Sequence, residues 1–302
     1  MDPDPVSGRP AVRPSIRQAD LLLIAATLTW GVSFVIVKKA LSASTPLAFL
    51  DVRFALATLA LAPFVDFRAS WSRGEIRGGL LLTALLASGF ACQAVGLQYT
   101  TPARSAFIVA LSSVLAPLVA LVVLRHRTGW MVLVALAIAG VGIYFLTSPE
   151  AGGLNRGDLW TMITAVVFGG HIVAVTELSR VYDARRLVWL QIAGTTAGVA
   201  IAALVLEDMR MAWSSSLIAA LVFTGLIATA AALLWQMRAQ RHMTSARASL
   251  LLCLEPVFAA VTSWLYWGET FTLNQAAGGV MILVAMMLAV WGEAKGVDAK
   301  AL

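Results

Sequence analysis

The sequence has 302 residues, of which 60% are hydrophobic and 13% are charged. Soluble domains carry about 25% charged residues, and the mean hydropathy here is +0.84. This composition excludes a soluble enzyme, a nucleic-acid-binding module and a disordered protein, and it predicts an integral membrane protein. The net charge of +6 comes from basic residues in short loops. That pattern is typical of membrane topology control, so we expect no nucleic-acid partner.

The chain contains ten mostly apolar stretches of about 20 residues, the length that a membrane-spanning helix needs. In chain order they lie at residues 20–41, 46–66, 79–98, 102–124, 129–147, 158–179, 187–206, 215–236, 245–267 and 273–292. The stretches are too long and too rich in Ala and Leu for strands, and they lack the alternation of a β-barrel. We therefore predict an all-α membrane protein with ten transmembrane helices.

Polar segments flank the apolar part of the chain. Residues 1–19 hold four prolines and three arginines and predict a disordered tail, and residues 293–302 predict a second tail. The first tail is not a signal peptide, because the apolar run after it has full spanning length. The loops between the stretches are too short for a separate domain, so we expect the function to lie within the helices.

The basic residues predict the orientation of the chain. With the N-terminus in the cytoplasm, and with Arg53 and Arg247 left out because they lie at or just inside helix starts, fifteen Lys and Arg residues fall on the cytoplasmic side and five on the other. This asymmetry favours a multi-pass protein of the inner membrane with both termini cytoplasmic.

The sequence contains an internal repeat. Residues 101–117 align without gaps with residues 244–260, with six of 17 positions identical. The same offset relates Gln93 to Gln236, and a second offset relates residues 30–33 to residues 168–171. Two five-helix halves, residues 20–147 and 158–292, follow from this repeat. Because five is odd, the halves insert with opposite orientation, as in many secondary transporters, whose substrate sites lie between the halves.

Several segments resemble the EamA-type permeases of the drug/metabolite transporter superfamily, which includes the YddG-type amino-acid exporters. The segments are Leu254 to Ala260 with Trp267-Gly268-Glu269, and the pairs Trp30-Gly31 and Gly278-Gly279. The resemblance covers almost the whole chain and implies export of amino acids or related metabolites. In the first half, Ser112-Ser113 and Arg125-His126 replace Glu255-Pro256 and Gly268-Glu269, which puts mirror-image roles of the halves in doubt.

Motifs for other chemistry are missing from the sequence. It has no phosphate-binding G-x-x-x-x-G-K-[ST] loop and no H-E-x-x-H zinc motif, and its three histidines are scattered. We expect neither an enzyme nor a metal or other cofactor. Transport is then facilitated diffusion or is coupled to an ion gradient, with protons as one candidate.

Polar side chains deep in the apolar stretches are candidates for a substrate cavity, because such groups are costly in a membrane. Glu255, near mid-membrane, is a candidate ammonium contact, proton site or gate; a carboxyl hydrogen-bonded within the bundle is the alternative. His171 is a candidate for substrate binding or proton relay, or else a packing residue. The amides of a glutamine pair suit a zwitterionic solute. The full predicted set is Trp30, Ser33, Gln93, Ser112, Ser113, His171, Gln236 and Glu255.

Charged residues near the expected helix ends are candidates for gates or anchors. Arg104 and Arg247 occupy equivalent positions in the repeat, and Asp51 and Arg53 lie in the start of the second helix. The sequence thus predicts a secondary transporter that exports small metabolites by alternating access. A carrier of cationic drugs or amines, a nucleotide-sugar carrier, an intramembrane enzyme and a scaffold are the alternatives. Monomer and homodimer both stay open.

Overall fold

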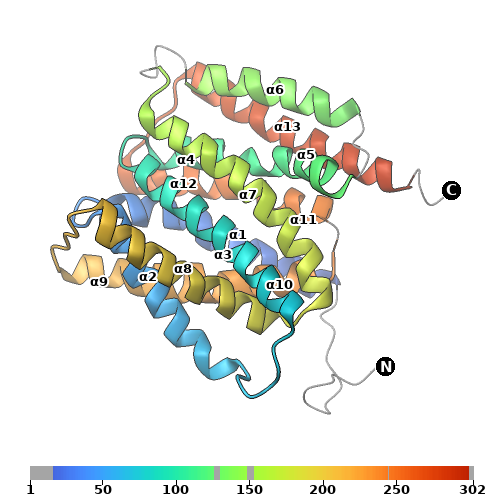
Figure 1. Ribbon diagram of the computed structural model, residues 1–302. Helices are drawn as coiled ribbons and strands as arrows, with labels where there is room; N and C mark the ends of the chain where they lie inside the picture. Colours follow the sequence, from blue (N-terminus) through green and yellow to red (C-terminus); the bar gives the residue numbers. More distant parts are fainter. Residues whose placement is uncertain (1–15, 126–129, 148–152, 244, 299–302) are drawn as a thin grey trace.

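The computed structural model describes residues 16–125, 130–147, 153–243 and 245–298, and within them the fold is all-α. Figure 1 shows the helices gathered in one bundle. In chain order the elements are α1 Ile16–Ala40, α2 Pro46–Leu61, η1 Ala62–Phe64, α3 Arg73–Leu97, α4 Pro102–Ala110, α5 Ser112–Leu124, α6 Trp130–Leu146, α7 Arg156–Val181, α8 Ala184–Leu206, α9 Ser215–Val222, the π-helix η3 Phe223–Ala231, α10 Ala232–Gln240, α11 Ser245–Leu252, α12 Glu255–Trp267 and α13 Leu273–Asp298.

Nine helical runs within the described residues are long and apolar enough to cross a membrane, and the apolar α6 is shorter. Some of these runs combine consecutive elements: α4 and α5 are separated by a break at Leu111, whereas α9, η3 and α10 continue into one another without a break. The chain is therefore a membrane protein of about ten helices, as its composition predicts.

Several helices extend beyond the apolar stretches. α1 begins at Ile16 rather than residue 20, α3 begins at Arg73 rather than residue 79, and α13 continues to Asp298. Hydropathy marks the apolar part of a helix, whereas its hydrogen bonds continue into polar residues: the Ser72 side chain accepts from the Glu75 N–H and caps α3. The tail expected through residue 19 is wrong for residues 16–19, and residues 1–15 lie outside the described part.

The internal repeat has a structural counterpart in two bent spans. The bend between α4 and α5 falls at Leu111, and the bend between α11 and α12 falls at Leu254. These leucines are related by the offset that relates Gln93 to Gln236. The same offset relates Arg125 and Gly268, which end α5 and α12 in the left-handed conformation at φ 54° and 64°. Arg125 thus adopts the backbone conformation of the glycine that it replaces.

Close helix contacts repeat in the same way. A Cβ on Gly31 of α1 would lie 2.8 Å from the carbonyl oxygen of Glu255, and a Cβ on Gly169 of α7 would lie 3.2 Å from that of Ser112. α1 therefore packs on the start of α12 as α7 packs on the start of α5. In both places a glycine permits the close approach of a broken span.

Contacts at one end of the bundle fix the direction of α1 relative to α7. Lys38, near the end of α1, donates from Nζ to the carbonyl of Leu97 at the end of α3 at 2.7 Å. Gly157, at the start of α7, packs against Gly96 of the same α3 end. The end of α1 and the start of α7 therefore lie together, and the two helices run in opposite directions (Figure 1).

Candidate functional site

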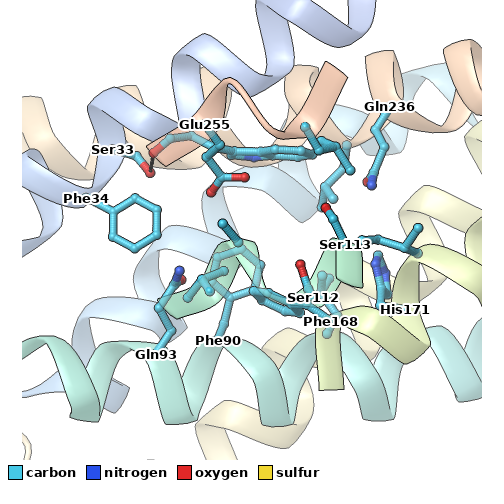
Figure 2. Close-up of a pocket in the computed structure, with 17 residues that line it drawn as sticks. Ser33, Phe34, Phe90, Gln93, Ser112, Ser113, Phe168, His171, Gln236 and Glu255 are labelled. Atoms are coloured by element: carbon cyan, nitrogen blue, oxygen red, sulfur yellow. Dashed lines mark hydrogen bonds between the residues drawn. The ribbon is translucent and has the colours of Figure 1, made fainter. Parts of the chain in front are cut away.

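A cavity lies between the helices, where the two bent spans face each other. Figure 2 shows its walls, and the cavity has a volume of about 70 Å³. The eight residues that the sequence predicts for a substrate cavity all line this space: Trp30, Ser33, Gln93, Ser112, Ser113, His171, Gln236 and Glu255. The structure thus brings together side chains from α1, α3, α5, α7, α10 and α12.

Glu255 is the first residue of α12 and directly follows the bend at Leu254. Its carboxyl group points into the cavity in Figure 2. No hydrogen bond or ion pair joins this carboxyl to another of the described residues. The hydrogen-bonded carboxyl that the sequence left open is therefore not the arrangement found, and the group is available to a solute.

His171 occupies one end of the cavity in the view of Figure 2, near Gln236. Its Nε2 lies 2.9 Å from Oε1 of Gln191 on α8. With the proton on Nε2 donated to that oxygen, the Nδ1 lone pair remains an acceptor. The Gln191 Nε2 group is buried and has no hydrogen-bond partner in the part of the chain that the structure describes, so this end offers neutral donors and acceptors.

Trp30 is held in the wall of the cavity by the π-helix. Its Nε1–H donates to the carbonyl of Ala228 at 2.8 Å, and Ala228 lies within η3. π-Helical turns are rare and frequently occur at functional sites. The indole is therefore fixed in one position rather than free to rotate.

Apolar side chains make up the rest of the walls, and three phenylalanines among them were missed by the sequence analysis. They are Phe34, Phe90 and Phe168. The rings of Phe90 and Phe168 meet edge to face, with centroids 5.3 Å apart. Phenylalanine carries no signal of its own in an apolar helix, although the fact that Phe168 aligns with Trp30 in the repeat is a usable indication.

Arg104 and Arg247 lie at helix ends, outside the cavity lining, and each has a carboxylate partner. Arg104 pairs with Asp158 of α7, and Arg247 pairs with Asp20 of α1 at 2.6 Å. The sequence analysis missed both aspartates. A signal was present, because Asp20 and Asp158 are related by the offset that relates Ser33 to His171.

Arg53 differs from its expected place at a helix end. It lies in the middle of α2 and is 2% exposed. A recess lined by Arg53 also contains Ser33, Phe34 and Gln93, which line the central cavity as well. Asp51, two residues before it, is half-buried and lines neither space. In the described residues, no three His, Cys, Asp or Glu side chains gather closely enough to hold a metal ion.

Comparison with known proteins assigns the chain to a family. The model of the EamA-like transporter family matches residues 17–148 and again residues 155–291. The chain belongs to this family. Membership supports a membrane transporter of small molecules and not an enzyme.

Relatives agree with that assignment, and a solved structure shares the fold. An uncharacterized transporter of Archaeoglobus fulgidus is 31% identical over 271 residues, covering 89% of this chain and 85% of the relative. The uncharacterized transporter YoaV of Bacillus subtilis is 19% identical over 276 residues, covering 88% and 94%. A protein of known crystal structure superimposes with a TM-score of 0.67 at 17% identity, covering 92% of this chain and 99% of that one. This likeness concerns the fold.

Proposed function

We propose that this EamA-like transporter is a secondary exporter of amino acids, with apolar or aromatic side chains preferred, in the inner membrane with both termini cytoplasmic. The central observation is the free carboxyl of Glu255 in a cavity that also carries amides and phenylalanine rings. The carboxyl suits an ammonium group, the amides of Gln93 and Gln236 suit either end of a zwitterion, and the rings suit an apolar side chain.

The repeat supports an alternating-access mechanism. Gly31 and Gly169 place the two bent spans against α1 and α7 in equivalent ways. In inverted-repeat transporters, the substrate site lies between the halves, which move relative to each other. The eight cavity residues would then stay around the solute while the seals at the two ends open in turn.

Efflux from proteoliposomes tests this function. Vesicles containing the purified protein are preloaded with a mixture of amino acids, and the solutes that leave are identified by mass spectrometry, with and without a pH gradient. We expect protein-dependent efflux of leucine- or phenylalanine-like amino acids. If efflux is faster when a proton gradient is directed into the vesicles, the transport is proton antiport. Equal rates with and without the gradient indicate facilitated diffusion. No efflux from folded protein in either condition contradicts the proposal.

Export of cationic amines is the second candidate, and the same carboxyl favours it. An amine needs Glu255 and the aromatic walls but no partner for a carboxylate. Including phenethylamine in the preloaded mixture compares the two classes directly. An amine that leaves while the amino acids remain would select this second candidate.

A further inference from the structure

Arg53 presents a buried cation beside the cavity. It lies at the middle of α2, and its 2% exposed fraction places the guanidinium inside the bundle. A charged side chain in a membrane-spanning helix is costly and ordinarily pairs with an opposite charge. Among the described residues, no carboxylate forms an ion pair with Arg53.

The contacts of the guanidinium hold it without neutralising it. Its Nε–H donates to the hydroxyl of Thr229 at 2.7 Å. Its Cζ lies 4.7 Å from the ring centroid of Phe90 and 5.6 Å from that of Phe54. The Nη2 group is buried and has no hydrogen-bond partner among the described residues. The planar fork is thus fixed by rings and a hydroxyl, and donor capacity remains for a ligand.

The π-helix positions this arginine as well as Trp30. Thr229 belongs to η3, and Gly225 of the same segment lies so close to α2 that an added Cβ would be 3.0 Å from the Arg53 carbonyl oxygen. The π-helix and its close contact with α2 therefore both position Arg53. This arrangement is costly to build, and a binding role accounts for its presence.

The guanidinium adjoins the space that a solute would enter. Ser33, Phe34, Phe90 and Gln93 line both the recess of Arg53 and the central cavity. In Figure 2, Ser33, Phe34 and Gln93 lie at the end of the cavity opposite His171, with Glu255 between them. The solute would therefore meet a fixed cation at this end of the cavity.

The other end carries no such charge. Gln191 occupies the repeat position of Arg53, by the offset that relates Ser33 to His171. It forms the neutral contact with His171 at 2.9 Å. The cavity is therefore asymmetric in charge, with a cationic end at Arg53 and a neutral end at His171 and Gln191.

We propose that Arg53, together with the Gln93 amide, binds the carboxylate of the transported solute while Glu255 faces its ammonium group. This inference rests on the proposed function and narrows its substrate class to zwitterions with a free carboxylate. Arginine forms strong, frequently bidentate hydrogen bonds with carboxylates. Amines and carboxyl-blocked amino acids lack the group that Arg53 requires.

Two series of matched solutes test the inference on the wild-type protein. One is L-phenylalanine, L-phenylalaninamide and phenethylamine, and the other is L-leucine, L-leucinamide and isoamylamine. We expect the amide and the amine to be transported at least about tenfold less efficiently than the acid, because a charge-assisted hydrogen bond is lost. If the acids move and the other members move equally well, the inference is wrong while the proposed function stands. If neither acid moves, both are wrong.

Variants of Arg53 test whether this residue causes the preference for acids over amines. In Arg53→Gln we expect at least about a tenfold loss of L-phenylalanine transport with no loss for phenethylamine, and in Arg53→Lys a partial loss. Arg186→Gln is the matched control, because Arg186 is largely buried but pairs with Glu75 at 3.2 Å and lines none of these spaces. The control should retain the wild-type acid-to-amine ratio.

A binding measurement covers variants that transport poorly. Thermal unfolding in detergent is followed with L-phenylalanine or phenethylamine, in chloride and in gluconate buffers. We expect L-phenylalanine to stabilise the wild type and not Arg53→Gln. An unchanged acid-to-amine ratio in Arg53→Gln overturns the assignment. So does stabilisation by chloride alone that the variant loses, which would make Arg53 a site for an inorganic anion.

Discussion

The two ends of the bundle carry the same ion pair in different surroundings. Arg104–Asp158 and Arg247–Asp20 occupy equivalent positions of the repeat. The side chains of the first pair are 5% and 0% exposed, and those of the second are 44% and 24% exposed. Asp158 also accepts from the Thr100 hydroxyl at 3.0 Å and from the Asn155 N–H at 2.9 Å. Repetition in sequence therefore supplies the same groups, while packing decides how much each one stabilises.

Replacing the two aspartates should give the largest difference in stability between the two ends. Asp158→Ala leaves the Arg104 guanidinium buried beside no carboxylate, and breaking a buried pair costs about 3–5 kcal/mol. Asp20→Ala removes an exposed pair, worth about 1 kcal/mol or less. Chemical unfolding in detergent, followed by tryptophan fluorescence, should show this difference in free energy. Equal losses would mean that the two ends are alike in solution.

Glycine packing provides the next comparison. A Cβ on Gly157 would collide with the Gly96 carbonyl and lie 2.9 Å from the Thr100 nitrogen, whereas the repeat position of Gly157 is the buried Ala19. We expect Gly157→Ala to lower the free energy of unfolding by about 2 kcal/mol through overpacking, and Ala19→Gly by about 1 kcal/mol. The same unfolding assay measures both. A neutral Gly157→Ala would contradict the close contact of α3 with α7.

The first residues after the two bends can be compared by transport. Glu255 and Ser112 occupy equivalent positions, but only the first carries an ionisable group. We expect Glu255→Gln to reduce amino-acid efflux at least about tenfold through loss of a charged partner, and Ser112→Ala by about threefold or less. Wild-type rates in both Glu255→Gln and His171→Ala would remove the cavity as the transport site.

Substitutions at the two helix ends, Arg125 and Gly268, should change the free energy of unfolding least. Both adopt the left-handed conformation, which a residue with a Cβ adopts at a cost of about 1 kcal/mol. Gly268→Ala should lose about 1 kcal/mol, and Arg125→Gly should gain about 0.5 kcal/mol because the gain is partly offset in the unfolded chain. Thermal unfolding compares the two variants. A loss in Arg125→Gly would indicate that the arginine side chain has contacts of its own.

Much of the architecture was predictable because the membrane imposes it. Runs of apolar residues determine where helices lie, and the repeat indicates which deep polar residues face a shared interface. Depth and repeat position predict the eight cavity residues, and the structure places all of them around one space. Their role in binding stays a prediction.

The lateral position of Arg53 was not predictable in the same way. A helix that is apolar all round has no polar face to indicate how it is rotated. Whether Arg53 faced lipid, a neighbour or a cavity therefore depended on contacts with Thr229 and Phe90. The π-helix η3 was also not predictable from the sequence, because its residues Phe223–Ala231 are as apolar as those of an ordinary α-helix.

The π-helix also determines how α10 is rotated about the helix axis relative to α9. Successive residues of an α-helix are separated by about 100° around the axis. Deleting one residue from Phe223–Ala231 would therefore rotate all of α10 by about that angle relative to α9 and carry Gln236 away from the cavity wall. In this span, length and rotation are coupled: homologues that differ by a single residue here would present a different face of the same helix to their solute.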